Sequence, residues 1–255
     1  MHDFHIHIGQ FNELFYDYHD VFTVLKLSDV SEITLAYLTP KFDSQKNAVE
    51  FYHAVVNELK NAKEYAFTIG LSVNFLYWAD PLVLETGISL TQVFQEFPYF
   101  GIALHPVLHE WSSLHKKKTD RIFRFASLHN LPIFLHTGVS ERDTPLQFEK
   151  WFSEFPEVEV HLAHCKDPQP IIELFSKYTN LVGDTAFCPS DSYNEICDAG
   201  FRNRMFFGTD FPITHYYEQF GKSLITQDSV TVNSLIDNYR NQLKEQSKYV
   251  FQGIY

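Results

Sequence analysis

The sequence has only three cysteines, and they are spaced irregularly along 255 residues, at Cys165, Cys188 and Cys197. This number and spacing suit reduced thiols better than a disulfide framework. The N-terminus Met1-His2-Asp3 carries neither the basic region nor the apolar stretch of a signal peptide. We therefore expect a cytoplasmic protein.

Basic residues are also scarce. The chain has 20 Lys and Arg against 32 Asp and Glu, a net charge of −12, which argues against a nucleic-acid partner because duplex binding needs a basic face. No apolar run approaches the roughly 20 residues that span a bilayer. With 45% apolar residues the chain can bury a large core. We expect a small-molecule substrate as its partner, no nucleic acid and no membrane, with a homodimer left open.

Short apolar runs alternate with longer segments of helical period. The expected strands are Asp3–Ile8, Glu32–Leu38, Ala66–Asn74, Phe100–His105, Pro132–His136, Val158–His164, Asn180–Asp184 and Met205–Asp210. The expected helices are His19–Leu27, Ser44–Lys63, Ser89–Phe97, Asp120–His129, Leu146–Phe155, Pro170–Tyr178, Ser192–Gly200 and Ser229–Gln246.

This alternation indicates parallel strands joined by crossover helices. Eight such units in 255 residues match one α/β domain, a single (β/α)8 TIM barrel over residues 1–255. The one run of like charge, Lys116-Lys117-Lys118, is expected to be a solvated loop before a helix.

Potential metal ligands recur at the ends of these strands. His5 and His7 share one face of the first strand, because side chains alternate along a strand. His136, His164 and Asp210 each end a later apolar run. In a TIM barrel, active sites are built at the C-terminal rim of the strands. The His-x-His pair together with three further runs that end in His or Asp therefore indicates a metal site at this rim.

The motifs that carry this pattern are His-x-His, Leu-His-Thr-Gly ending at Gly138, Leu-Ala-His ending at His164, and Phe-Gly-Thr-Asp-Phe-Pro ending at Pro212. In this order and spacing the sequence resembles the amidohydrolase superfamily. More narrowly, it is similar to the amidohydrolase-related branch that includes the aminocarboxymuconate semialdehyde decarboxylases. The resemblance runs from Asp3 to Pro212.

The resemblance implies one divalent metal ion per chain, zinc, held at the rim by His5, His7, His136 and Asp210. Imidazoles and a carboxylate suit zinc, which lowers the pKa of a water in an open position. The resemblance also places His164 beside that water. Asp210 then takes a proton, while His164 polarises the substrate or orients the water.

Two-metal members of the superfamily carry a bridging lysine or glutamate on strand four. Here that strand reads Gly101–Pro106, where Ala103 cannot coordinate an ion. His105 shares the face of Ala103, so it could bind a second ion, contact substrate or plug the barrel. A single metal ion is the expectation.

Other polar residues have less specific interpretations. His161 is expected to face the helices, and Asp184 either faces the rim or caps a loop. His109 and His115 are expected to be solvated in a polar loop. His215 could reach the site from the last loop.

Residues that could contact substrate are His105, Arg142, Trp78, Tyr16 and His215, all expected on the rim or its loops. They suggest an aromatic or cyclic substrate whose carboxylate is held by Arg142, although simple surface exposure explains the same residues equally well.

The predicted activity is hydrolysis of an ester, lactone or amide of a small cyclic or carboxylate-bearing substrate. The alternative is non-oxidative decarboxylation on the same metal site, which also needs a cation for the departing carboxylate: Arg142, Arg202 or Arg204. A TatD-type nuclease is a further alternative, but it would need a Glu where this chain has Ala103 and a Glu-Thr-Asp where it has Gly208-Thr209-Asp210. A metal-binding barrel without catalysis completes the alternatives.

Overall fold

The computed structural model describes residues 1–109, 111, 116–223 and 225–250, so His115 lies outside the described residues. The chain divides into two compact units. The first unit comprises Met1–Pro40, Glu50–Phe75 and Phe207–Tyr255, and the second comprises Lys41–Val49 and Leu76–Phe206. That residues 1–255 form one domain stays a prediction.

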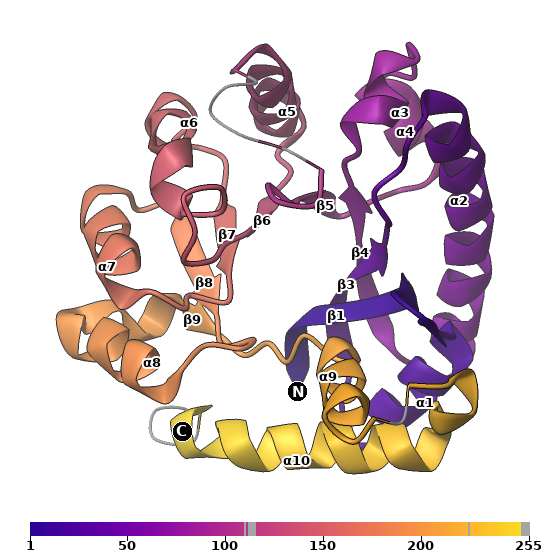
Figure 1. Ribbon diagram of the computed structural model, residues 1–255. Coiled ribbons are helices and arrows are strands. Elements are labelled where there is room, and N and C mark those ends of the chain that lie inside the picture. The colour runs from indigo at the N-terminus through magenta and orange to yellow at the C-terminus, as the bar shows by residue number, and fades with distance from the viewer. Residues whose placement is uncertain (110, 112–115, 224, 251–255) are drawn as a thin grey trace. The chain divides into compact units, whose positions relative to one another are not determined.

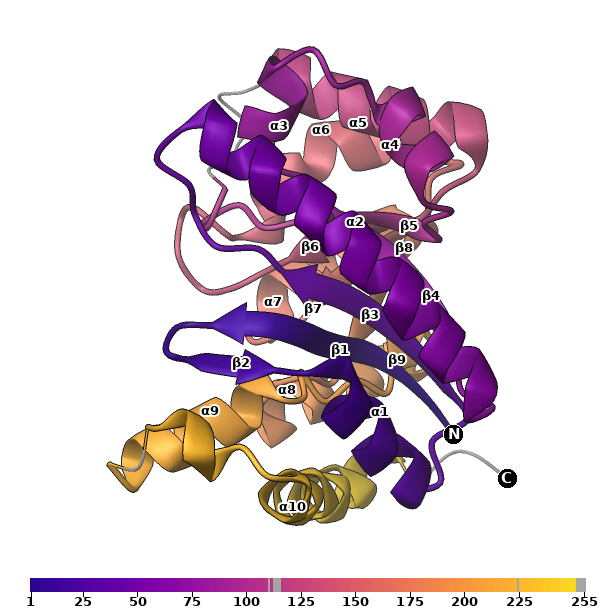
Figure 2. The same ribbon diagram turned by 90° about the vertical axis from the view of Figure 1, so that its right-hand side faces the viewer.

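The sheet of the first unit is built around β1 (His2–Phe11). β2 (Leu14–Tyr16) pairs with it antiparallel and β3 (Glu32–Leu38) pairs parallel, and the three lie side by side in Figure 2. β4 (Ser72–Trp78) begins in this unit and follows β3 in the strand order. The edge of β1 that β3 leaves open also accepts residues 207–211, because the amide of Phe4 donates to the carbonyl of Phe207 at 2.9 Å.

Four helices contribute to the first unit: α1 (Tyr18–Leu27), α2 (Gln45–Thr68, which starts in the second unit), α9 (Ile213–Gly221) and α10 (Val232–Val250). Asp17 caps α1 by accepting from the amide of His19. The buried face of α1 is apolar, with Val21, Phe22 and Leu25 fully buried, and it packs on α10. The helices of this unit therefore cover β1 with an apolar layer.

The second unit contains a parallel sheet in which the strands lie side by side in the order of the sequence. After the end of β4 come β5 (Gly101–Leu104), β6 (Ile133–His136), β7 (Val160–Ala163), β8 (Leu181–Asp184) and β9 (Met205–Phe206). Ile102 pairs with Ile133, and Ile133 with Val160. All three are fully buried, so the register aligns the core of neighbouring strands.

The helices of the second unit connect these strands. They are α3 (Pro81–Glu85), α4 (Leu90–Glu96), α5 (Lys116–His129), the 3-10 turn Pro145–Phe148 with α6 (Glu149–Glu154), α7 (Pro168–Lys177) and α8 (Ser190–Ile196), followed by the turns Cys197–Phe201 and Arg202–Arg204. Figure 1 shows α5 to α8 outside the strands β5 to β8. Parallel strands joined by helices are the crossover units that the sequence predicts.

The expected strands are confirmed, with shifts at several ends. The strand expected over Ala66–Asn74 begins only at Ser72, because α2 continues to Thr68. β2, α3 and α9 were missed. Lys116 to Lys118 do not form a loop: they begin α5, and Lys118 forms an ion pair with Glu85. Among the described residues, no helix is long and apolar enough to span a membrane.

Candidate metal and active site

The first unit brings together three of the predicted ligands. Pairing of β1 with residues 207–211 sets their positions, since the amide of Asp210 donates to the carbonyl of His5 and the amide of His7 donates to the carbonyl of Phe211, each at 2.8 Å. His7 Nε2 lies 3.0 Å and His5 Nε2 lies 3.6 Å from the same atom, Oδ1 of Asp210. These three residues form a group able to hold a metal ion.

The tautomer of His7 decides what this contact means. His7 Nδ1 lies 3.0 Å from the carbonyl oxygen of Ala36, and a carbonyl only accepts, so Nδ1 carries the proton and donates. In the neutral ring Nε2 then has a lone pair, which faces a carboxylate oxygen of Asp210. Two acceptors at this distance need a positive charge between them, either a proton or a metal ion.

Asp3 fastens the two segments that carry these ligands. Its carboxyl group is fully buried and accepts four hydrogen bonds: from Thr209 Oγ1 at 2.7 Å, Tyr239 OH at 2.9 Å, and the amides of His5 and Thr209 at 3.1 Å each. Burial raises the pKa of Asp3 to about 7, although these hydrogen bonds act in the opposite direction. Asp3 thus ties β1 to the segment just before Asp210 and to α10.

Both predicted catalytic residues have a backbone conformation that is uncommon for residues other than glycine. The φ angle is 58° at Asp210 and 74° at His164, in the left-handed region. Each is held by hydrogen bonds: Asp210 through the carbonyl of His5, and His164 through its amide, which donates to Asp184 Oδ1 at 2.9 Å. Strained residues of this kind are frequent at functional sites.

The second unit gathers three histidines at the ends of neighbouring strands. The His105 ring, just after β5, stacks on the His136 ring at 3.8 Å between centroids, and on its other neighbour, Trp78, at 5.8 Å. His164, just after β7, lies 3.0 Å from His136, between its Nε2 and the Nδ1 of His136. His105, His136, His164 and Trp78 are therefore one connected cluster.

A chain of hydrogen bonds sets the tautomer of His136. His164 Nδ1 lies 3.0 Å from the carbonyl oxygen of Ala186 and must donate to it. Neutral His164 then accepts at Nε2 from Nδ1–H of His136. The lone pair of His136 is consequently on Nε2, the nitrogen that a metal ligand would use. In this arrangement His164 orients His136.

Asp184 holds the backbone next to this cluster through hydrogen bonds. Its Oδ1 accepts from the amides of His164 and Ala186, and its Oδ2 lies 2.9 Å from His161 Nε2. The hydrogen bonds from the amides of His164 and Ala186 give Asp184 the loop-capping role that was one of its two expected roles. His161 is buried, with its ring stacked on Phe134, so both residues hold the backbone around His164.

Two residues expected on rim loops lie in the interior of the first unit. Tyr16 belongs to β2 and His215 to α9, both are fully buried, and Tyr16 OH lies 3.3 Å from His215 Nδ1. Their polar atoms have hydrogen-bond partners inside the unit, because His215 Nε2 also lies 3.2 Å from Ser234 Oγ. We therefore leave both out of the set proposed to contact substrate. Arg142 is exposed, as expected.

One further expectation is corrected: His109 is buried rather than solvated, at 7% exposure. Arg204 uses its Nη1 to donate to the carbonyls of Phe175 and Tyr178, at 2.9 and 2.7 Å, so this nitrogen holds the backbone around the end of α7. Sequence reasoning also missed Asp3, although a carboxylate within an apolar strand signals a buried group that needs partners.

The comparisons with known proteins agree with the motifs. The amidohydrolase family model matches residues 92–225, more than half of the chain, and the chain therefore belongs to the amidohydrolase family of enzymes. No curated protein matches the sequence.

Several solved structures have a similar fold. One is 4-oxalomesaconate hydratase from Rhodopseudomonas palustris, with TM-score 0.60, 11% identity and coverage of 97% of this chain and 99% of that chain. Another is a probable 2-pyrone-4,6-dicarboxylic acid hydrolase from Acinetobacter baumannii, with TM-score 0.58, 12% identity and coverage of 97% and 93%. A third is a dihydroxybenzoic acid decarboxylase from a Polaromonas species with bound manganese, with TM-score 0.55, 12% identity and coverage of 98% and 99%. With the strand order, these likenesses confirm the predicted (β/α)8 barrel class.

Proposed function

We propose that this amidohydrolase is a metal-dependent hydrolase that directs a water onto the carbonyl of an ester, lactone or amide in a small cyclic or carboxylate-bearing substrate. The observation that carries the proposal is the approach of His7 Nε2 and His5 Nε2 to a single carboxylate oxygen of Asp210, at 3.0 and 3.6 Å. Two ligands about 2 Å from a tetrahedral ion lie about 3.3 Å apart. The three atoms thus match the spacing of a metal-ligand set.

The donor set fits a divalent ion, and we propose zinc. Two imidazoles and a carboxylate are borderline ligands that suit zinc, and the same set suits iron or manganese. Three protein ligands leave a position open, as catalytic sites require. When bound, such an ion supplies a water with a pKa near neutrality and polarises a carbonyl. A similar fold with bound manganese supports a divalent ion.

The chain's own residues would orient the reactants and move the proton. The carboxylate of Asp210 lies within 3.6 Å of both His5 and His7, so we assign it as the acceptor of the proton from the water. His7 is fixed by its bond to Ala36 and can act only through Nε2. That His136 supplies a further ligand, and that His164 acts on the water or substrate, stay predictions from the sequence.

The tautomer of His105 favours a role in substrate binding over a second metal ion. The amide of Leu108 donates to His105 Nδ1 at 3.2 Å, so neutral His105 carries its proton on Nε2. It is then a donor to a substrate oxygen, and its ring, stacked with Trp78 and His136, offers a flat surface. Arg142 remains the proposed partner of a substrate carboxylate. One ion per chain is the proposal.

The test combines elemental analysis with a substrate panel. Lactones, esters and amides are assayed beside hydroxybenzoate-type acids with release of CO₂ monitored, before chelation, after chelation and after reconstitution with zinc or manganese. Turnover of a carbonyl substrate should require metal and should be lost in His7→Ala. The exposed His129 provides the matched control, because His129→Ala should retain metal and activity.

Decarboxylation is the outcome that would contradict the preference for hydrolysis. Metal-dependent release of CO₂ that Arg142→Ala abolishes, with no turnover of any lactone, ester or amide, would make the chain a decarboxylase. Full retention of metal by a His5→Ala, His7→Ala double variant would instead contradict the metal site itself.

A further inference from the structure

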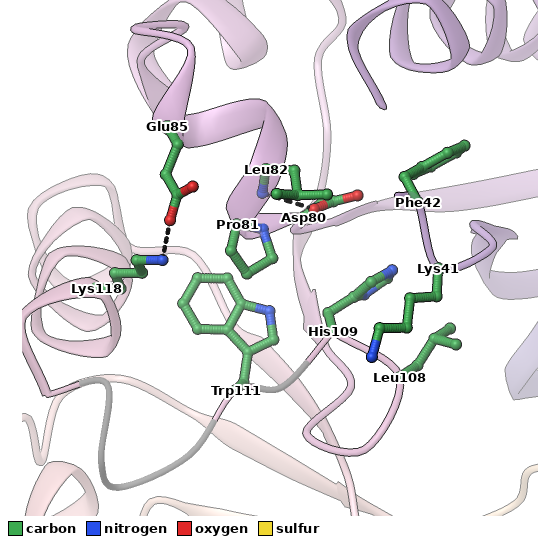
Figure 3. Close-up of a pocket in the computed structure, with 10 residues that line it drawn as sticks. All are labelled: Lys41, Phe42, Asp80, Pro81, Leu82, Glu85, Leu108, His109, Trp111 and Lys118. Atoms are coloured by element: carbon green, nitrogen blue, oxygen red, sulfur yellow. Dashed lines mark hydrogen bonds and ion pairs between the residues drawn. The ribbon is translucent and has the colours of Figure 1, made fainter. Parts of the chain in front are cut away.

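The second unit contains a pocket of about 240 Å³ that the proposed metal chemistry does not use. It lies between the start of α3, the segment after β5 and the segment before α2, and Figure 3 shows the residues that line it. Its volume corresponds to about eight water molecules at about 30 Å³ each, so it has room for a small organic molecule.

Asp80 is the polar group that distinguishes this pocket. It caps α3, with Oδ1 accepting from the amide of Leu82 at 2.8 Å. Asp80 is only 3% exposed, and its other oxygen, Oδ2, is buried with no hydrogen-bond partner in the described part of the chain. Capping explains one oxygen only. Because buried acceptors are almost always paired, the second oxygen calls for a donor that the described residues do not supply.

The other residues that line the pocket indicate that the rest of the ligand is apolar. Pro81, Leu82 and Trp111 supply apolar surface, and the Trp111 ring is fixed because its indole N–H donates to the carbonyl of Ala79 at 2.9 Å. Lys118 is paired with Glu85 at the edge of the pocket. An apolar body with one strong donor is the complement of these walls.

Lys41 adds a second polar feature. In the view of Figure 3 its amino group lies on the other side of the His109 ring from the Asp80 carboxyl group. Lys41 therefore adds a positive charge to the wall that carries Asp80, which a carboxylate on an amine ligand could approach. The charge of Asp80 makes the amine the essential group.

We propose that this pocket binds a small primary amine with an apolar body, whose ammonium group donates to Asp80 Oδ2, and that a carboxylate on the same molecule adds affinity through Lys41. This site goes beyond the proposed hydrolase activity and does not depend on it.

Calorimetric titration of the full-length protein with three matched probes tests the proposal. The probes are 2-phenylethylamine, which has the amine alone, L-phenylalanine, which has both groups, and 3-phenylpropionate, which has the carboxylate alone. The titrations contain EDTA, so that no probe binds through a metal ion. We expect L-phenylalanine to bind more tightly than 2-phenylethylamine, and 3-phenylpropionate to bind at least tenfold more weakly than either.

The variants separate Asp80 from its surroundings. Asp80→Asn retains the capping oxygen, since Asn is as good an N-cap as Asp, but removes the charge; it should weaken both amines at least tenfold. Glu154→Gln removes the same charge from an exposed residue of the second unit that is paired with Lys150 and does not line the pocket, and should change the affinities less than twofold. Lys41→Met should bring L-phenylalanine to the affinity of 2-phenylethylamine.

Three results would overturn the proposal. These are no binding of either amine at millimolar concentration, binding of 3-phenylpropionate as tight as that of the amines, or equal affinity of an amine for Asp80→Asn and the unchanged protein. Thermal unfolding of each variant establishes that it is folded, so a loss of affinity can be assigned to the pocket.

Discussion

Replacement of Asp3 tests how the first unit holds Asp210 beside the two histidines. Asp3→Ala removes the acceptor of four hydrogen bonds. The hydroxyl groups of Thr209 and Tyr239 can rotate, but the amides of His5 and Thr209 would be left buried without an acceptor. At about 1–3 kcal/mol for each buried amide, the free energy of unfolding should fall by about 2–6 kcal/mol.

Asp3→Asn is the matched control. The amide oxygen of Asn can accept from both backbone amides, and its NH₂ group can donate to the hydroxyl oxygens of Thr209 and Tyr239. Only the charge-assisted share of the bonds is lost, so we expect a decrease of about 1 kcal/mol. Urea unfolding of the metal-free proteins, followed by circular dichroism, measures both changes. Equal losses for Ala and Asn, or a loss below about 1 kcal/mol for Ala, would refute this account of Asp3.

Three more predictions concern histidines. If His136 is a ligand, His136→Ala should weaken zinc binding at least tenfold in a chelator competition, whereas His129→Ala should not; equal affinities would remove it from the set. His164→Ala should retain most of the metal and lose roughly 10²–10⁴ in rate, and metal loss as large as that of His136→Ala would show that it acts through His136. Burial lowers the pKa of His215 below its ordinary value, so its neutral form stabilises the fold above about pH 6.5 and this contribution is lost as the pH falls; urea unfolding between about pH 7 and pH 5 should show a steeper decrease for the unchanged protein than for His215→Gln.

The strands and most of the predicted site follow from local patterns. β1 and β6 are apolar runs that contain or end at a histidine, and His164 directly follows β7. Period and position therefore sufficed to find His5, His7, His136, His164 and Asp210, and the family motifs added their expected roles. These residues can be predicted from the sequence because a strand fixes the direction of its side chains.

Residues whose roles depend on distant partners could not be predicted in this way. Asp3 is explained only by Thr209 and Tyr239, more than 200 residues away in sequence. Tyr16 was expected on a loop because nothing local announces β2 or the contact of Tyr16 with His215. Asp80 carries an ordinary capping signal, and only the structure shows that its second oxygen is buried.

Each of the proposed ligands His7 and His136 makes a hydrogen bond through its other ring nitrogen, and the acceptor of that bond affects how basic the ring is. Histidine ligands often donate their other N–H to a carboxylate, which makes the ring a stronger base. Here His7 donates to the carbonyl of Ala36, and His136 donates to His164, which in turn donates to the carbonyl of Ala186. A backbone carbonyl fixes the tautomer and the ring orientation, yet it cannot take up the proton. A proton and a metal ion therefore compete at Nε2 alone. Asp210, whose Oδ1 lies 3.0 Å from His7 Nε2 and 3.6 Å from His5 Nε2, is left to take the proton from the reacting water.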